Sequence, residues 1–368
     1  MTTLSYDRAR EVKEFDESKI GVKGLVDAGS ATIPRIFHHP SHNLPSKTHH
    51  PHQFSIPTID LSLPHPTLVD LIRDASRNWG FFNIVNHGIP QSVLDRTISA
   101  VRSFNELPTE AKSKYYTRDP KASVTFSTNV DLYRSEAASW RDTIQIRAGP
   151  VPVEPEKIPS VCREELLDWD GQATALWERL MGFLSEGLGL GHERLKEMSC
   201  LQGRVMVAHY YPYCPQPDLT VGLAGHTDPG VLTVLLQDMV GGLQLKVEME
   251  GEGEDVWVDV KPVPGSIVIN VGDLLQIMSN DEYKSVAHRV LANPFKEPRI
   301  SIALFFNPGR RGETDLFGPL PELVSHDKPA LYRDFTMTEF LVAFFSKDLR
   351  SKSLVHHFAI RTEGSIDD

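Results

Sequence analysis

Hydrophobic positions in the second half of the chain gather in short runs of five to seven residues, the length of β-strands. Valine, isoleucine, leucine and aromatic residues dominate these segments, and Gly, Pro, Asn and Asp turns separate them, a pattern typical of a sandwich or barrel. The predicted strands are 205–211, 232–237, 243–247, 256–260, 267–271 and 300–306. The pattern therefore predicts a β-rich core beyond residue 200.

The first half shows helical spacing instead. Apolar residues three and four positions apart predict helices over 68–79, 92–104 and 166–190, and the last of these ends at Gly189 and Gly191. Short strands are expected at 56–61 and 81–86. Near the C-terminus, Thr336 or Thr338 can cap a final helix that runs to Phe345.

This order of elements predicts an α+β chain with four sections. The first, 1–56, is an N-terminal extension with a loop-like segment rich in His and Pro. An N-terminal α/β and helical section follows at 57–200, then a strand-rich core at 201–310. A C-terminal helical segment and tail occupies 311–368.

Composition narrows the class of protein. The net charge of −11 and pI near 5.8 argue against nucleic acid as a main partner, because phosphate binding needs a basic face. No apolar run approaches the roughly 18 residues of a membrane span, and the charged N-terminus lacks the apolar core of a signal peptide. The three cysteines lack metal-site spacing, which indicates a reduced protein. Together these features predict a cytoplasmic protein without membrane partners.

His226, Asp228 and His288 are the candidate metal ligands. A His-x-Asp triplet alone is weak evidence, but residues i and i+2 of a strand share a face, so His226 and Asp228 could bind one ion. Two histidines and one carboxylate form the facial triad of non-haem Fe(II) oxygenases, and Zn(II) also accepts such ligands. The alternative for His288 is a core histidine satisfied by hydrogen bonds.

Arg299 and Ser301 offer a guanidinium and a hydroxyl on one face of a strand. The planar fork of Arg binds both oxygens of a carboxylate, so the pair suits a small dicarboxylate beside the metal. Tyr211 could donate a further hydrogen bond to the same carboxylate. An inward Arg on a strand can also form a structural ion pair.

Six motifs are spread over the chain. They are WGFFNIVNHG at 79–88, YPYCPQP at 211–217, GLAGHTD at 222–228, GGLQ at 241–244, SVAHR at 285–289 and RIS at 299–301. Together they resemble the motifs of plant 2-oxoglutarate/Fe(II)-dependent dioxygenases in the isopenicillin N synthase-like superfamily, and the resemblance covers nearly the whole chain. The segments GVKGLVD and FHHP resemble a narrower branch, the 1-aminocyclopropane-1-carboxylate oxidase homologues, which includes alkaloid, benzoxazinoid and glucosinolate hydroxylases.

The resemblance implies a double-stranded β-helix, or jelly roll, as the core, flanked by helices. It implies that His226, Asp228 and His288 bind catalytic Fe(II), and that Arg299, Ser301 and Tyr211 hold the far carboxylate of 2-oxoglutarate. O2 would be the oxidant and ascorbate a stimulant. The expected reaction is oxidation of a small molecule by a monomeric enzyme, most simply hydroxylation, with release of succinate and CO2.

The substrate wall is expected at four positions. Phe305 and Asn307 continue the strand face of Arg299, and by resemblance Thr143 and Gln145 line the opposite wall. Phe305 could equally fill the core. An aromatic ring among neutral polar groups suggests an alkaloid, terpenoid or phenolic of plant specialised metabolism. Where many relatives have Asn, this chain has His209, which we expect to hydrogen-bond near the cosubstrate.

Three alternative functions stay open at this point. An iron oxidase of the same fold would bind its substrate directly to the metal and need no 2-oxoglutarate. A zinc hydrolase would need a general base beside the metal-bound water, and no residue obviously supplies one. A non-catalytic small-molecule binder would not need the ligands and Arg-x-Ser intact. Within the leading hypothesis, hydroxylation, desaturation, ring closure and demethylation share the same first step.

Overall fold

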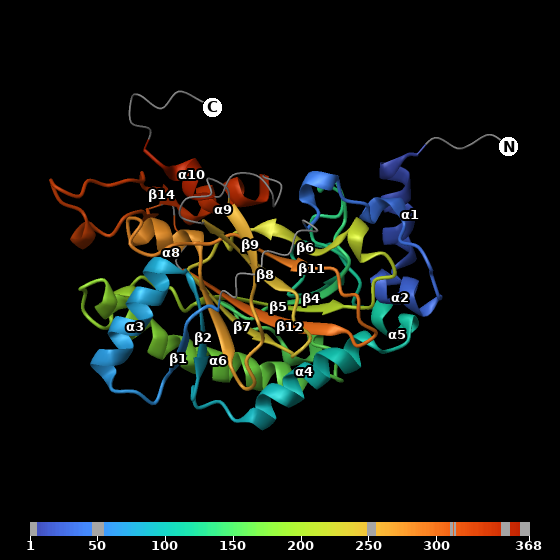
Figure 1. Cartoon of the computed structure of the whole chain (residues 1–368), viewed down its shortest axis with the longest axis horizontal. Coiled ribbons are helices and arrows are strands. Elements are labelled where there is room, and N and C mark those ends of the chain that lie inside the picture. Colours follow the sequence, from blue (N-terminus) through green and yellow to red (C-terminus); the bar gives the residue numbers. More distant parts are fainter. Residues whose placement is uncertain are drawn as a thin grey trace.

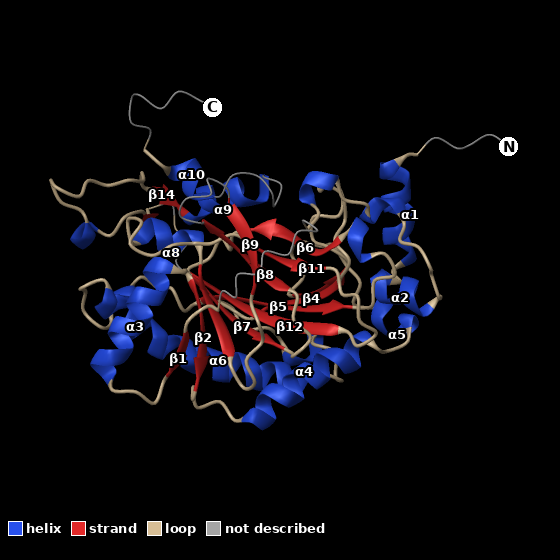
Figure 2. Cartoon of the chain, in the orientation of Figure 1, coloured by secondary structure: helices blue, strands red, loops and turns tan. Residues whose placement is uncertain are grey.

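Two β-sheets form the centre of the computed structural model, and helices surround them (Figures 1 and 2). The structure describes residues 6–45, 55–248, 255–309, 312, 314–346 and 354–360. Apolar side chains of both sheets, such as Tyr211, Leu223 and Val268, share one buried cluster between the sheets. This arrangement confirms the predicted α+β fold with a jelly-roll core.

The larger sheet has eight strands in the order β1-β2-β10-β7-β12-β5-β4-β3. Its strands are β1 Thr58–Asp60, β2 Phe81–Val85, β3 Val124–Ser127, β4 Asp142–Arg147, β5 Gly203–Tyr211, β7 Leu232–Gln237, β10 Ile267–Val271 and β12 Arg299–Asn307. The smaller sheet, in the order β6-β11-β8-β9, has β6 Val221–His226, β8 Leu243–Glu248, β9 Asp255–Asp259 and β11 His288–Leu291. A separate pair joins β13 Leu316–Phe317 to β14 Phe335–Thr336.

Helices lie on the periphery of the sheets (Figure 2). They are α1 Arg8–Ser18, α2 Gly21–Asp27, α3 His65–Asn78, α4 Gln91–Asn105, α5 Thr109–Ser113, α6 Arg163–Gly187, α7 Arg194–Glu197, α8 Asp273–Met278, α9 Met337–Ser346 and α10 Leu354–Phe358. α4 and α6 run below the larger sheet in Figure 1, whereas α1 and α2 lie at one end of the molecule. None of the described helices is both long and apolar enough to cross a membrane.

Alternation along the strands gives the larger sheet two different faces. On β4, β5 and β12 the outer-face residues are buried in the main hydrophobic cluster, which α4 and α6 complete. Trp177 of α6, for example, stacks on Phe306 with ring centroids 4.7 Å apart. The inner-face residues Thr143, Gln145 and Phe305 are instead only partly buried. The inner face is therefore where a small molecule can reach the sheet.

The sequence patterns located most of these elements. The long helix, the helices now labelled α3 and α4, and the strands β5, β7, β8, β9, β10 and β12 lie within a few residues of their predicted bounds. The strands β3, β4, β6, β11, β13 and β14 were not among the predicted elements. Thr336 rather than Thr338 caps α9, because its hydroxyl accepts the N–H of Glu339 at 3.2 Å. The extension, for which only a loop-like segment rich in His and Pro was predicted, also contains two helices, α1 and α2, before that segment.

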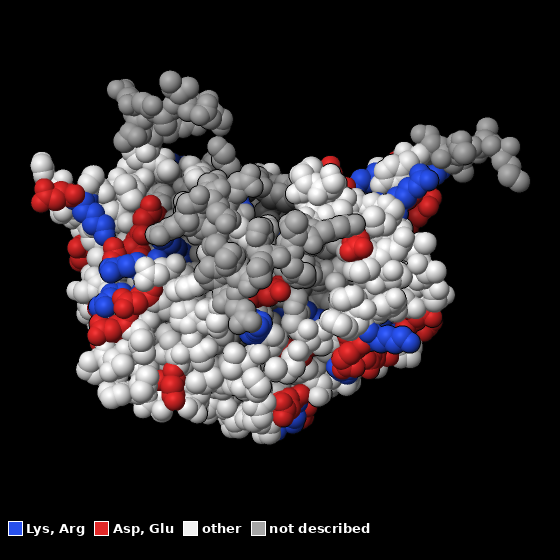
Figure 3. Space-filling view, in the orientation of Figure 1, with Lys and Arg blue, Asp and Glu red and all other residues white. Residues whose placement is uncertain are grey.

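Strands β1 to β4 come from the section before residue 200, yet they form both edges of the larger sheet. The division of the chain at residues 56, 200 and 310 stays a prediction. Residues 46–54, which include the second part of the His- and Pro-rich segment, lie outside the described residues, as do residues 249–254. On the face shown in Figure 3, acidic and basic side chains are interspersed over the part that the structure describes.

Candidate active site

His226 and His288 meet across the smaller sheet. His226 is the last residue of β6, His288 is the first of β11, and the antiparallel register pairs them directly. Their ring centroids are 4.4 Å apart. The expectation that Asp228 shares a strand with His226 is wrong, because β6 ends at His226 and Asp228 lies in the following loop. The loop nevertheless turns the carboxylate back toward both imidazoles.

The three side chains present their ligand atoms to one another. The Nε2 atoms of His226 and His288 each lie 3.6 Å from Oδ1 of Asp228. On the opposite side of each ring, Nδ1 faces a backbone carbonyl, that of Ala224 at 2.9 Å and that of Val286 at 3.3 Å. Each Nδ1–H can donate to its carbonyl, which leaves the Nε2 lone pair free to bind a metal ion.

Two buried side chains fix the orientation of the Asp228 carboxylate. Thr233 Oγ1 and Asn270 Nδ2 donate to Oδ2 at 2.6 and 2.7 Å, so Oδ1 is the oxygen left facing the imidazoles. Burial alone would raise the pKa of Asp228, but the two imidazoles and the Thr233 hydroxyl lower it well below its ordinary value. Burial lowers the pKa of His288 to about 4. Both groups therefore favour the forms that bind metal.

Arg299, Ser301 and Tyr211 also come together, on the inner face of the larger sheet. Register pairs Arg299 with Tyr211 and Ser301 with His209. The buried Arg299 guanidinium donates to Ser301 Oγ and to Gln237 Oε1, both at 3.0 Å, and lies 4.9 Å from the centre of the Tyr211 ring. Both of these hydrogen-bond acceptors are neutral, so the cation has no carboxylate among them.

Two hydrogen-bond donors, on Arg299 and Tyr211, are suited to an anionic ligand. Arg299 Nε and Tyr211 Oη are buried and have no hydrogen-bond partner among the residues that the structure describes. A buried donor without an acceptor is costly, and a carboxylate could accept from a guanidinium and a phenol together. The donor set therefore fits one carboxylate of a small diacid such as 2-oxoglutarate.

The four residues expected at the substrate wall share the inner face of the larger sheet, two on β4 and two on β12. Thr143 is level with Ser301, at the end of β12 opposite to Asn307. Phe305 lies opposite Val205 and Thr233, and Gln145 lies opposite Val207. A Cβ at Gly230 would lie 3.2 Å from Oδ1 of Asn307, so this amide is beside the loop that carries Asp228.

Thr143 has a definite partner, because its hydroxyl lies 2.9 Å from Nδ1 of His209. The pKa of His209 is well below its ordinary value because the ring is buried and because the Arg141 and Arg299 guanidiniums are close. His209 is therefore neutral near physiological pH.

Sequence reasoning missed Thr233, Asn270, Gln237 and Arg141. Asn270 and Gln237 contribute through the pairing of β10 with β7 and of β7 with β12, and Arg141 through a contact with Gly222 of the other sheet. Thr233 lies five residues from Asp228, but none of the four residues belongs to a motif that names a metal or carboxylate site.

A second group of potential ligands lies at the surface. His65 at the start of α3 and His192 after α6 each hydrogen-bond one oxygen of Glu186, at 2.7 and 2.6 Å. Both carboxylate oxygens are thus engaged, and we interpret the cluster as a link between α3 and α6.

Comparison with known proteins supports one family over most of the chain. The model of the 2OG-Fe(II) oxygenase superfamily matches residues 202–308, and the model described as non-haem dioxygenase in morphine synthesis N-terminal matches 56–164. A 1-aminocyclopropane-1-carboxylate oxidase homolog 4 of Arabidopsis thaliana is 47% identical and covers 97% of this chain and 99% of the relative. A homolog from Solanum lycopersicum is 44% identical over 97% of this chain and 98% of its own length.

Solved structures agree with this assignment. The crystal structure of JOX2 in complex with 2OG, Fe and JA superposes with a TM-score of 0.81 and 30% identity, over 93% of this chain and 98% of that one. The dioxygenase for auxin oxidation in rice gives a TM-score of 0.68 and 27% identity, over 83% of this chain and all of that one. The chain therefore belongs to the 2OG-Fe(II) oxygenase superfamily, as a relative of the plant 1-aminocyclopropane-1-carboxylate oxidase homologues, and is an Fe(II)- and 2-oxoglutarate-dependent dioxygenase.

Proposed function

We propose that this enzyme oxidises a plant specialised metabolite, most simply by hydroxylation, with His226, Asp228 and His288 as the iron ligands. The observation that carries this proposal is the convergence of both Nε2 atoms on Oδ1 of Asp228, 3.6 Å from each. Fe(II) bound there, with 2-oxoglutarate and O2, would supply the oxidising chemistry, with succinate and CO2 as the other products. The protein's task is to orient the reactants and keep water away.

The roles of the other residues follow from their surroundings. Arg299, Ser301 and Tyr211 would bind the far carboxylate of 2-oxoglutarate, and the unpartnered donors on Arg299 and Tyr211 support this. Phe305, Asn307, Thr143 and Gln145 would border the substrate. Because Thr143 is hydrogen-bonded to His209, its contribution would be to hold that ring, and Phe305 would offer the main apolar surface.

An apolar substrate that carries oxygen, such as an alkaloid, terpenoid or phenolic, suits this wall. Val205, Val207, Leu235 and Phe305 make the partly exposed part of the inner face largely apolar. The neighbours whose names mention JA and auxin oxidation also act on or bind small organic molecules. We also propose that the enzyme is a monomer and that it works in the cytoplasm, the compartment that its cysteine content suggests.

The test is an anaerobic titration of the protein with Fe(II) and 2-oxoglutarate, followed by visible absorption. We expect a weak metal-to-ligand charge-transfer band that needs both components. The band should be lost in His226→Ala, which lacks a metal ligand. In Arg299→Ala the band should need far more 2-oxoglutarate, while Fe(II) still binds.

Two results would contradict the proposal. Bound Fe(II) without any band would favour an oxidase that binds its substrate directly to iron. Normal turnover by His226→Ala, measured as succinate release with a panel of plant metabolites, would show that the iron ligands are elsewhere.

A further inference from the structure

A second buried guanidinium, that of Arg141, lies beside the candidate 2-oxoglutarate site. Arg141 precedes β4 and is 4% exposed. Its Nη1 donates to Oδ1 of Asn129 and to the carbonyl of Gly222, both at 3.1 Å, and its Nε has no partner among the described residues. Gly222 belongs to β6, so Arg141 joins the two sheets.

The contact with Gly222 brings Arg141 close to Tyr211. The backbone of Gly222 packs so tightly on Tyr211 that a Cβ at residue 222 would lie 2.8 Å from the ring atom Cδ1. Arg299 approaches the same ring at 4.9 Å. Two buried cations therefore flank Tyr211, and the hydrogen-bond acceptors of both are neutral. Such a pair favours a bound carboxylate, because opposite charges attract strongly where water is excluded.

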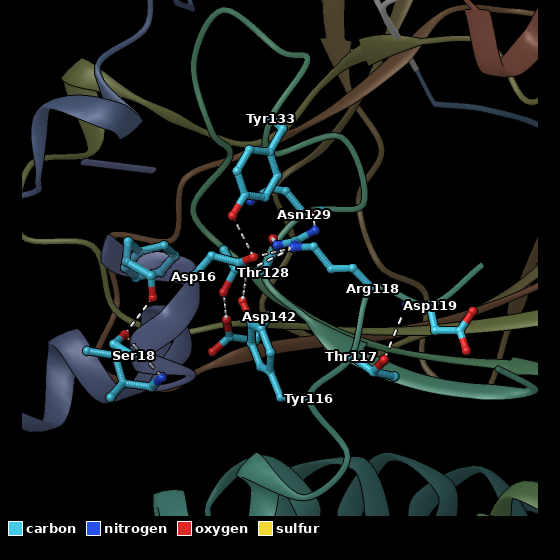
Figure 4. Close-up of polar contacts among 12 residues, drawn as sticks. Asp16, Ser18, Tyr116, Thr117, Arg118, Asp119, Thr128, Asn129, Tyr133 and Asp142 are labelled. Atoms are coloured by element: carbon cyan, nitrogen blue, oxygen red, sulfur yellow. Dashed lines mark hydrogen bonds and ion pairs between the residues drawn. The ribbon is translucent and has the colours of Figure 1, made fainter. Parts of the chain in front are cut away.

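The N-terminal segment 6–45 contacts the chain around Arg141 at two aspartates, Asp16 in α1 and Asp142 beside Arg141 (Figure 4). Asp16 of α1 accepts Arg118 Nε at 2.8 and 2.9 Å, and the hydroxyls of Tyr116 and Tyr133 at 2.6 and 2.9 Å. The same Arg118 donates to the carbonyls of Thr128 and Asn129 at 2.9 and 2.7 Å. Asn129 is also the residue that accepts from Arg141, so the network runs from α1 to the second cation.

Asp142, the residue that follows Arg141, binds the N-terminal end of α2. Its buried carboxylate accepts the N–H groups of Val22 and Lys23, both at 2.8 Å, and the Thr128 hydroxyl at 2.6 Å. Gly21 makes this contact feasible, since its φ is +69° and a Cβ there would lie 2.6 Å from Oδ2 of Asp142. The GVKG segment at 21–24 therefore fits this carboxylate closely.

We propose that Arg141 is a positioning residue of the 2-oxoglutarate site and that α1 and α2 hold it there through Asp16 and Asp142. This inference rests on the proposed function, because it assumes that the cosubstrate carboxylate lies at Arg299 and Tyr211. According to this inference, the N-terminal segment 6–45 affects the affinity for 2-oxoglutarate, although none of its residues is among those proposed to bind the metal or the cosubstrate.

The test compares 2-oxoglutarate and Fe(II) affinities, from the anaerobic absorption titration, in variants of the full chain. Arg141→Gln should weaken 2-oxoglutarate binding about tenfold, as expected for a lost interaction with a charged group, and should leave Fe(II) affinity unchanged. Arg141→Lys keeps the charge and should recover part of the loss. Under turnover, the KM for 2-oxoglutarate should rise more than kcat falls.

The second arm tests the N-terminal segment with a matched pair of glycine variants. Gly21→Ala brings a methyl group against Asp142, whereas Gly29→Ala changes a residue with a similar φ of +74° and no atom within 4 Å. Only Gly21→Ala should raise hydrogen exchange over 128–142 and weaken 2-oxoglutarate binding. If Gly21→Ala does not fold, Asp16→Asn serves, because it removes the ion pair with Arg118.

The outcomes separate this inference from the proposed function. If Arg299→Ala loses 2-oxoglutarate binding while Arg141→Gln keeps it, the role of Arg141 is wrong and the cosubstrate site stands. If Gly21→Ala or Asp16→Asn loosens 128–142 without changing 2-oxoglutarate affinity, the role of the N-terminal segment is wrong. Unchanged affinity in Arg299→Ala would contradict the cosubstrate site itself.

Discussion

The orientation of the Asp228 carboxylate depends on which of its two oxygens accepts hydrogen bonds from neighbouring side chains. Thr233 and Asn270 both donate to Oδ2, and both are almost fully buried. Oδ1 is then the oxygen nearest to the two imidazoles. Hydrogen bonds of this kind orient a ligand before the metal arrives and lower the free-energy cost of binding it.

Replacing Thr233 by Val keeps the shape of the side chain and removes its donor. We expect Thr233→Val to weaken Fe(II) binding about tenfold, because Asp228 then loses one of the two bonds that fix it. Anaerobic Fe(II) titration measures the effect. Thr97→Val is the control, since Thr97 is equally buried but donates to the Val93 carbonyl within α4. Equal Fe(II) affinities in the two variants would contradict the proposed role of Thr233.

The residues of the candidate site divide by whether a motif marks them. His226, Asp228, Arg299 and Ser301 could be named from the sequence because short spacings place each pair together. Thr233 lies only five residues from Asp228, but no motif marks it. Asn270 could not be named, because its bond to Asp228 requires β10 to lie beside β7 with a particular register. Spacing carries no information on that register.

At the scale of elements, hydrophobic periodicity predicted the helices that bury one continuous face. α6 buries a continuous stripe and was predicted, whereas Val12 is the only buried residue of α1, so α1 has no apolar stripe to detect. Asp7, whose carboxylate accepts the N–H of Arg10, is a capping signal that could have revealed α1. Besides the packing of Val12 and Phe15 in a small apolar cluster, α1 is held by polar contacts with distant residues, such as Arg118 with Asp16.

The packing of α6 against the larger sheet can be tested at Trp177. This side chain is fully buried and stacks on Phe306, the outer-face neighbour of Phe305 on β12. Trp177→Ala should lower the free energy of unfolding by about 3–5 kcal/mol, because the helix cannot close the cavity that is left. Urea denaturation measures the loss. Leu71→Ala, at a residue 39% exposed on α3, should cost less than about 0.5 kcal/mol, and a similar loss in both would contradict this packing.

For the molecule as a whole, the candidate site connects the two sheets. The imidazoles of His226 and His288 come from β6 and β11 of the smaller sheet, whereas Arg299 and Tyr211 come from β12 and β5 of the larger. The proposed cosubstrate would reach from the metal to Arg299 and so span both. Its binding should therefore stabilise the packing of one sheet on the other.

Adding 2-oxoglutarate to the anaerobic Fe(II) protein should raise the free energy of unfolding by about 2.7 kcal/mol at one hundred times its dissociation constant. Only the folded chain brings the two sheets together, so the unfolded chain does not compete for the ligand. In Arg299→Ala the same 2-oxoglutarate concentration should add much less, while Fe(II) still stabilises the protein through His226, Asp228 and His288. Denaturation at several 2-oxoglutarate concentrations measures both increments. Full stabilisation of Arg299→Ala would mean that the far carboxylate binds elsewhere, and the link between the sheets would then rest on the metal alone.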